Sequence, residues 1–468
     1  MAGTKAGTSK RESIRIAALA GFSGDRIDPA VEVLRNGNVN YGVFECLAER
    51  TIALAQQEKL KVPELGYDHM LRRRMEAVLP ICAERGIKII TNMGAANPLA
   101  AAKVVRKVAS DVGAPHLKVS AVLGDDIFDR IGRYADVPLM EAEELENPKA
   151  TVKDLKNKVS ANAYLGADGI VRALEGGADI VVTGRVADSS LFLAAPMFEF
   201  GWRDTDYQLL GSGIVAGHLL ECGAQVTGGY FDGKYNAAVA PEVWRIGFPI
   251  AEISHDGGVV ITKAEGSGGM VTKETCTAQL LYEIHNPSMY ITPDAVADFS
   301  NVNFIELGAD RVLVRDATAT ARTETLKVSI GYSDCHIGEG EISYSGYRAR
   351  ERAIEAADIV LTRLKRLEVP VIGDPMVEII GAMYTPWSRL SYVHSQKGLY
   401  RLLNGVRLRV AARTETQEAA ERIGNEVESL YTNGPGGGGG ARKSVEKSVS
   451  IASILIPRAD VQVSVADR

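Results

Sequence analysis

Short apolar runs alternate with amphipathic stretches along the first part of the chain. The runs predict five buried strands, at residues 14–21, 40–45, 87–92, 116–123 and 178–183. The stretches between them predict helices over residues 68–85 and 161–175 and two that begin at Asp28-Pro29 and Asn97-Pro98. In the first of these two, we expect Asp28 as the N-cap and Pro29 at the first helical position. Strands that alternate with helices indicate βαβ units and a parallel sheet.

The pattern changes after about residue 292. Strand-like runs then follow one another at residues 304–307, 311–315 and 326–332, and two helical stretches follow at 347–367 and 414–430. We therefore expect an α/β protein with two domains. A Rossmann-like domain at 13–290 has a mostly parallel sheet with flanking helices, and a smaller α+β domain occupies 291–468. Residues 1–12 are small, polar and basic, and we expect them to form a disordered tail.

Composition limits the functional classes. A formal net charge of -6 argues against a nucleic-acid partner, which requires a basic face. The five cysteines include no CxxC pair, so a disulfide framework or a cysteine zinc site is not expected. No apolar run is long enough to span a membrane, and the first residues lack the apolar core of a secretory signal. These features predict a cytoplasmic protein without a membrane partner, and we expect it to form a homo-oligomer.

The residues directly after the predicted strands are rich in glycine and acids. Ligands of parallel sheets bind outside the carboxyl ends of the strands, so these residues are the first candidates for a site. Each loop alone is also consistent with an ordinary turn, but five such loops together indicate a site. Arg185 can clamp a carboxylate or phosphate, and Glu45 and Asp188 can act as acids or bases. The predicted binding residues from these loops are Ser23, Gly24, Asp25, Asn92 and Arg185.

Two further glycine-rich segments are candidates for anion binding. Gly268 and Gly269 lie between a strand at 259–262 and a helix that starts near Thr275, where backbone amides and a helix N-terminus favour an anion; a sharp turn is the alternative. Gly437 and Gly438 belong to the run 436–440, which Arg442 follows. A flexible linker is the alternative there, but the apolar, strand-like run at 451–457 favours a loop inside a domain.

His218 and Glu221 lie three residues apart in a predicted helix, so they share one face. Such a pair can perform acid–base catalysis or ligate a metal. The alternative is a buried, hydrogen-bonded histidine at a helix end. We predict His218, Glu221, Glu45 and Asp188 as the catalytic residues. Cys46 and Cys222 are interpreted as buried, inert thiols.

Seven of these segments resemble one known family, the acyclic terpene utilisation AtuA family. They are residues 21–26 (GFSGDR), 41–51 (YGVFECLAERT), 91–98 (TNMGAANP), 183–188 (TGRVAD), 218–225 (HLLECGAQ), 247–252 (GFPIAE) and 433–439 (NGPGGGG). The namesake of the family is associated with the breakdown of acids derived from citronellol and geraniol, beside enzymes that handle acyl-CoA thioesters. The resemblance implies an acyl-CoA or branched-acid substrate and a hydratase or lyase step. Some relatives carry an additional C-terminal domain, which implies that this piece is either a separate small accessory protein or absent.

Three functions follow from these observations. The first is an enzyme of acyl-CoA or branched, terpenoid carboxylic acid catabolism, a hydratase or lyase that uses acid–base catalysis. The second is a non-catalytic ligand-binding or scaffolding subunit of a catabolic complex. The third is a lyase that depends on a divalent metal held by His218, Glu221 and the strand-end acids. We commit to no cofactor and to no metal site, and a divalent metal and a CoA thioester as substrate both stay open.

Overall fold

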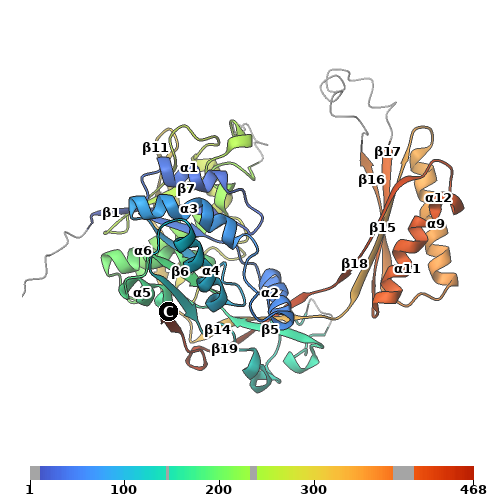
Figure 1. Cartoon of the computed structure of the whole chain (residues 1–468), viewed down its shortest axis with the longest axis horizontal. Coiled ribbons are helices and arrows are strands. Elements are labelled where there is room, and N and C mark those ends of the chain that lie inside the picture. Colours follow the sequence, from blue (N-terminus) through green and yellow to red (C-terminus); the bar gives the residue numbers. More distant parts are fainter. Residues whose placement is uncertain (1–10, 144–146, 232–239, 383–404, 468) are drawn as a thin grey trace, which may run out of the picture. The chain divides into compact units, whose positions relative to one another are not determined.

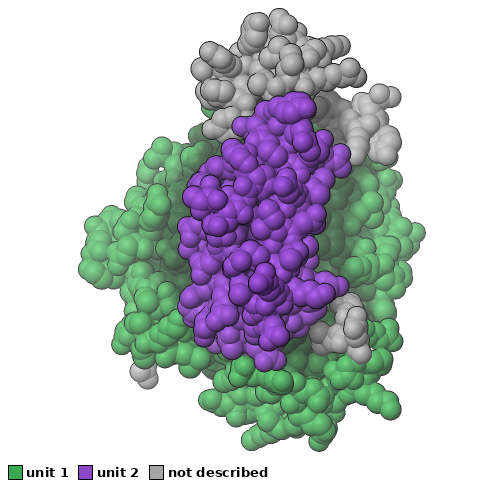
Figure 2. Space-filling view, turned by 90° about the vertical axis from the view of Figure 1, so that its right-hand side faces the viewer, with its two compact units in different colours: residues 1–332, 451–468 green, residues 333–450 purple. Residues whose placement is uncertain are grey.

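The computed structural model of the chain describes residues 11–143, 147–231, 240–382 and 405–467. The chain divides into two compact units, residues 1–332 with 451–468 and residues 333–450 (Figure 2). Most of the tail predicted at residues 1–12 lies outside the described residues. In the described part of the chain, no helix is long and apolar enough to cross a membrane.

The first unit is built on a ten-stranded sheet whose central strands are parallel (Figure 1). This confirms the predicted α/β fold. Each pair of neighbours in the order β1-β2-β3-β6-β4 is parallel, and these strands are β1 Ser13–Ala20, β2 Tyr41–Phe44, β3 Lys88–Thr91, β6 Ile180–Thr183 and β4 Val119–Leu123. Antiparallel strands extend both edges of this core. They are β7 Pro249–Ser254, β8 Val259–Lys263, β12 Arg311–Arg315 and β11 Asn303–Gly308 beside β1, and β20 Ser464–Asp467 beside β4.

Helices cover both faces of this sheet because successive strand residues point to opposite sides. Along β1, Ala17 and Leu19 pack against one set of helices, and Ile14 and Ile16 pack against the other. The first set is α1 Asp28–Asn36, α3 Leu71–Arg85 and α4 Pro98–Asp111. The second set is α5 Asp168–Glu175, α6 Asp188–Phe200, α7 Tyr207–Glu221 and α8 Lys273–Leu280. The result is three layers with an apolar core on each side of the sheet.

Two smaller sheets complete the first unit. One has the order β13-β10-β9, with β13 Thr318–Thr320, β10 Val296–Asp298 and β9 Tyr290–Ile291. The other has the order β19-β14-β5, with β19 Ser450–Pro457, β14 Thr325–Tyr332 and β5 Lys158–Ala163, and helix α2 Glu49–Lys61 lies close to β14 and β5.

Two local predictions are wrong. The helix expected over residues 161–175 begins only at Asp168, because the residues up to Ala163 form β5. Ala161 has a high helix propensity, but pairing with Ile330 of β14 overrides that propensity. Asp28 is the first residue of α1 and not its N-cap, which is Ile27. At α4 the expected cap is confirmed, since the Asn97 side chain accepts a hydrogen bond from the amide of Ala100.

The second unit has the element order β15 His336–Ser345, α9 Ala349–Arg366, β16 Val371–Ala382, β17 Gly405–Thr414, α11 Gln417–Glu428, α12 Leu430–Asn433 and β18 Gly439–Lys447. Its sheet order is β16-β17-β15-β18, and all neighbours are antiparallel. This βαββαβ arrangement is that of ferredoxin-like units. Its core lies between the sheet and α9 with α11, where Ile342, Val360, Val410 and Ile423 are buried.

The division between the units differs from the domain boundary expected near residue 290. Strands β11 and β12 continue the edge of the first sheet through β8, and β19 and β20 return to the first unit from the end of the chain. The change from alternating to strand-rich pattern therefore marks the change from the parallel centre to antiparallel additions, and the second unit is an insertion between β14 and β19.

Candidate active site

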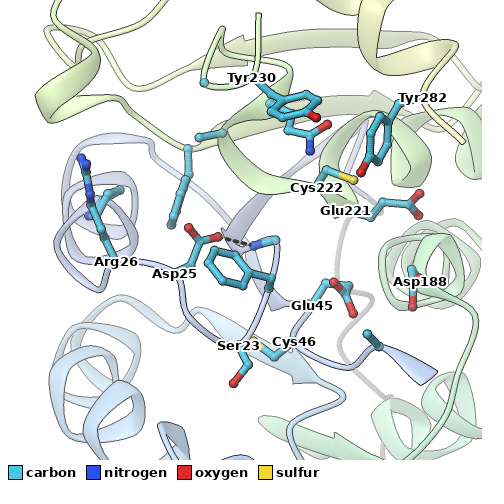
Figure 3. A pocket seen from close by; sticks show the side chains of 18 of the residues that line it. Ser23, Asp25, Arg26, Glu45, Cys46, Asp188, Glu221, Cys222, Tyr230 and Tyr282 are labelled. Carbon is cyan, nitrogen blue, oxygen red and sulfur yellow. Dashed lines mark hydrogen bonds between the residues drawn. The ribbon is translucent and has the colours of Figure 1, made fainter. Parts of the chain in front are cut away.

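A cavity of about 660 Å³ lies beyond the carboxyl ends of the parallel strands, and the described residues that line it all belong to the first unit (Figure 3). The loop after β1, the residues after β2, the start of α6, the end of α7 and the residues after α8 form its wall. Five acidic residues are among those that line it: Asp25, Glu45, Asp188, Glu221 and Glu283. The structure thus brings together the predicted residues Ser23, Asp25, Glu45, Asp188 and Glu221.

Glu45 is buried at the end of β2, and one of its oxygens is saturated with hydrogen bonds. Oε1 accepts from the amide of Leu47 at 2.9 Å and from Nδ2 of Asn92 at 2.8 Å. Burial raises the pKa of Glu45 to about 8, and the negative charge of Asp188 adds to the rise. The protonated form of Glu45 is therefore favoured at pH 7. Because Oε1 already accepts two hydrogen bonds, the proton belongs on Oε2, which is left for the cavity.

Asp188 opens α6 and forms an ion pair with the buried guanidinium of Arg185. Arg185 also donates to the carbonyl oxygens of Leu47 and Val186, and its charge lies 4.6 Å from the centroid of the Tyr164 ring. Burial raises the pKa of Asp188, and Arg185 limits the rise. The Asp188 side chain is 38% exposed, so its carboxylate is accessible from the cavity.

The loop that carries Arg185 is itself held by a buried acid. Asp125 follows β4, and its Oδ2 accepts from the amide of Arg185 at 2.8 Å and from Nδ2 of Asn162 at 3.0 Å. Burial raises the pKa of Asp125 to about 6. The strand-end acid of β4 therefore positions the β6 loop and does not line the cavity.

His218 positions Glu221, another of the acids that line the cavity. Its Nδ1 lies 2.8 Å from Glu221 Oε1, and its Nε2 lies 3.2 Å from the carbonyl oxygen of Leu280. A carbonyl only accepts hydrogen bonds, so Nε2 carries a proton. Burial lowers the pKa of His218, but the charge and hydrogen bond of Glu221 outweigh burial and raise it. Both ring nitrogens of His218 have hydrogen-bond partners within the protein. His218 therefore positions Glu221, and Glu221 is the residue of the pair that lines the cavity.

The three predicted residues Asn92, Arg185 and His218 do not line the cavity. Each lies behind it and holds one carboxylate through a hydrogen bond or ion pair. The arrangement combines a neutral carboxylic acid, Glu45, with a carboxylate beside a guanidinium, Asp188. Two acids whose environments separate their protonation states are the usual composition of an acid–base site.

The loop after β1 is fixed against the end of α7. The amide of Gly21 donates to Asp25 Oδ2 at 2.7 Å, and Ser23 Oγ donates to Asp68 Oδ2 at 2.5 Å. A Cβ on Gly21 would lie 2.3 Å from the carbonyl carbon of Cys222, so only glycine fits this approach. Gly24 belongs to the same loop but does not line the cavity.

Sequence reasoning missed Arg74, which is fully buried beneath this loop. Its Nη2 donates to the carbonyl oxygens of Phe22, Ser23 and Asp25 at 3.0 to 3.2 Å, and its Nη1 donates to Cys46 Sγ at 2.8 Å. Arginine among the apolar positions of α3 is the signal that could have indicated this role.

Four lining residues that follow α7 and α8 were also not predicted, because the loops after the strands were the first candidates for the site. They are Gln225, Tyr230, Tyr282 and Glu283, all of which line the cavity. Glu283 has φ +59°, a conformation that is unusual for glutamate and often found at functional sites.

The other predicted glycine residues lie elsewhere. The amides of Gly268 and Gly269 donate to the carbonyl oxygens of Arg245 at 3.0 Å and Pro241 at 2.8 Å, so they are not available to an anion. Gly437, Gly438 and Arg442 belong to the second unit. Arg442 lies in β18, opposite Glu341 of β15. Gly268 and Gly269, which lie in the same unit as the cavity, are not among its lining residues.

Metal ligation was left open by the sequence. Among the described residues, no group of three or more histidine, cysteine, aspartate or glutamate side chains is placed to hold a metal ion.

Comparison with known proteins identifies one relationship. No curated protein and no solved structure matches the chain. The family model described as acyclic terpene utilisation family protein AtuA matches residues 14–466, which is nearly the whole chain. The match includes the strand-end loops and α7, from which the cavity is built. The chain therefore belongs to the acyclic terpene utilisation AtuA family, whose name implies a catabolic role.

Proposed function

We propose that this protein is an enzyme of branched, terpenoid acyl catabolism that adds or removes water, or cleaves a carbon–carbon bond, by acid–base catalysis. The observation that carries the proposal is that two acids, the buried Glu45 and the Arg185-bound Asp188, line one cavity, where burial raises the pKa of Glu45 to about 8. A family role in terpene utilisation is consistent with such a substrate.

The two carboxyl groups suit a dehydration and its reverse. Asp188 takes the proton from the carbon next to a thioester or ester carbonyl, which that carbonyl acidifies. Glu45 Oε2 gives its proton to the departing hydroxyl group, which leaves as water, and a carbon–carbon double bond forms. In hydration, the same two groups exchange roles. Glu221, held by His218, completes the polar wall.

The charge of the cavity favours a neutral acyl derivative over a free carboxylate. Five acidic side chains line it, and Arg26 is the only cation among its lining residues that the structure describes. The buried cations Arg74 and Arg185 are already engaged by carbonyls and by Asp188. A thioester or ester avoids the repulsion that a carboxylate meets here, and Phe22, Leu47 and Phe248 offer apolar contact to the hydrocarbon beside the carbonyl.

The test is hydration of a branched α,β-unsaturated acyl thioester, followed by loss of the absorbance of the conjugated thioester. Wild type should be active, and Glu45→Gln and Asp188→Asn should each lower turnover by about 10²–10⁴-fold. Near-wild-type rates in both variants would contradict the proposal. An inactive wild type that the thioester nevertheless stabilises against heat would favour the non-catalytic alternative.

A further inference from the structure

A second cavity, of about 270 Å³, lies on the other side of Asp188. Its wall comes from β9, β14 and β19, from Tyr164 and from the first residues of α6. Asp188 lines both this cavity and the larger one. A molecule whose reacting atoms lie at Asp188 therefore has room to extend in two directions.

The second cavity is lined mainly by apolar and aromatic side chains, although three threonines, Asp188 and Lys327 also line it. Ile291, Leu326 and Leu455, from three different strands, line it. Ile291 is 55% exposed and Leu455 is 48% exposed, although large aliphatic side chains usually avoid water. Apolar side chains that gather around a concave surface are typical of a site for an apolar ligand.

Among the described residues, Lys327 is the cation that lines the second cavity, and it is already paired. Lys327 Nζ lies 2.9 Å from Glu49 Oε1, which also accepts hydrogen bonds from Tyr164 at 2.7 Å and Ser329 at 2.8 Å. No lining residue is therefore left to attract an anion such as a phosphate. The walls suit hydrocarbon instead.

We infer that the second cavity holds the hydrocarbon end of the substrate and sets the chain length that the enzyme accepts. The larger cavity then holds the carbonyl and the group attached to it. The inference rests on the proposed function only in that Asp188 faces the reacting carbons. Leu455 and Ile291, at the wall of the second cavity, determine where the chain must end.

The experiment measures binding by calorimetry for a series of methyl esters, from butanoate to dodecanoate. Wild-type affinity should rise by about fourfold for each methylene group that becomes buried, until the cavity is full. In Leu455→Trp the bulky ring fills part of the cavity. Affinity should then stop rising at a shorter ester, and the longest esters should bind at least about tenfold more weakly than to wild type, while butanoate binds as before.

Two further variants make the result specific. Ile291→Trp changes the wall at a different strand, β9, and should likewise make affinity stop rising at a shorter ester. Two independent variants keep the test informative if one of them folds poorly. Leu60→Trp is the matched control, since Leu60 lies on α2, is 63% exposed and lines neither cavity. It should keep the wild-type profile. Unchanged profiles in both cavity variants, or equal weakening at all chain lengths, would overturn the inference.

The binding readout separates this inference from the proposed function. Loss of the chain-length effect, with Glu45→Gln still inactive, would reject the second cavity and keep the acid–base site. A shifted chain-length profile, with Glu45→Gln fully active, would reject the acid–base roles and keep the cavity as a hydrocarbon site.

Discussion

Asn92 Nδ2 donates a hydrogen bond of 2.8 Å to Glu45 Oε1, while Asn92 Oδ1 accepts from the amide of Cys46 at 2.8 Å. The side-chain amide of Asn92 thus links the carboxyl group of Glu45 to the backbone of the next residue, Cys46. It also stabilises the ionised form of Glu45 and so limits the rise of its pKa.

Asn92→Leu should therefore move the pKa of Glu45 upward. We expect the fall of kcat/KM at high pH to occur at a higher pH than in wild type, with a rate about tenfold lower at the optimum. The measurement is kcat/KM against pH. A lower rate with an unmoved alkaline limb would mean that Asn92 only supports the structure.

In the dehydration direction, wild-type activity should itself fall with rising pH through about 8, because the neutral form of Glu45 is then the proton donor. Above that pH, kcat/KM should fall by about tenfold per pH unit if one proton is lost. Glu45→Gln should abolish this limb together with most of the activity. An alkaline limb that persists unchanged in Glu45→Gln would assign it to another group.

The same substitution should stabilise the fold at high pH. The pKa of Glu45 is about 8 in the folded protein against 4.5 ordinarily, so the fold favours the protonated form. That contribution is fully present below pH 4.5 and is lost as pH rises through about 8. Glutamine mimics the protonated acid at all pH values. Glu45→Gln should therefore melt at a higher temperature than wild type at pH 9, and the difference should shrink toward pH 5.

Arg185→Lys should lower both stability and activity. The planar guanidinium donates hydrogen bonds to the carbonyl oxygens of Leu47 and Val186 and to the carboxylate of Asp188. An ammonium group cannot make these three bonds in the same geometry. We expect a loss of about 2–4 kcal/mol in the free energy of unfolding, measured by denaturant titration. Arg203→Lys is the matched control, since Arg203 pairs with Asp206 at the same spacing but is 75% exposed. It should change stability by less than about 0.5 kcal/mol. An equal loss in the free energy of unfolding in the two variants would show that burial of Arg185 does not strengthen its contribution.

Gly338→Ala should destabilise the second unit. Helix α11 approaches β15 so closely that a Cβ on Gly338 would lie 2.1 Å from the carbonyl oxygen of Ala420. We expect a loss of about 1–3 kcal/mol as the helix is displaced, measured by thermal unfolding. Gly381→Ala, in β16 of the same sheet, meets no atom within 4 Å and should be neutral. A neutral Gly338→Ala would contradict the close packing.

The sequence predicted the centre of the fold well because the parallel strands are buried on both faces. Such strands are continuous apolar runs, as at 14–21 and 178–183, and they end in the loops that form the cavity. The misassigned helix at 161–175 is rich in alanine, and only pairing with a strand more than 160 residues later decides its structure. Local pattern does not contain that information.

The candidate site was predicted by residue type more accurately than by role. Asn92, Arg185 and His218 were chosen as groups that meet a ligand, yet each supports an acid in front of it. Sequence spacing cannot distinguish a side chain in the cavity wall from one behind it, because both occupy strand ends or helix faces. The glycine run at 436–440 stood out by composition, but composition does not reveal in which unit a loop lies.

The insertion of the second unit between two paired strands has a consequence for biosynthesis. The chain leaves the first unit after Tyr332 and returns at Ile451, and the amide of Ser448 bonds to the carbonyl oxygen of Cys335 where the two crossings meet. A ribosome completes the second unit before it makes β19 and β20, so the nascent inserted unit can close its own core first. The first unit must wait, with the edge of β4 unpaired, for the last strand to emerge. The unit that holds the cavity begins to be made first and is finished after the inserted unit.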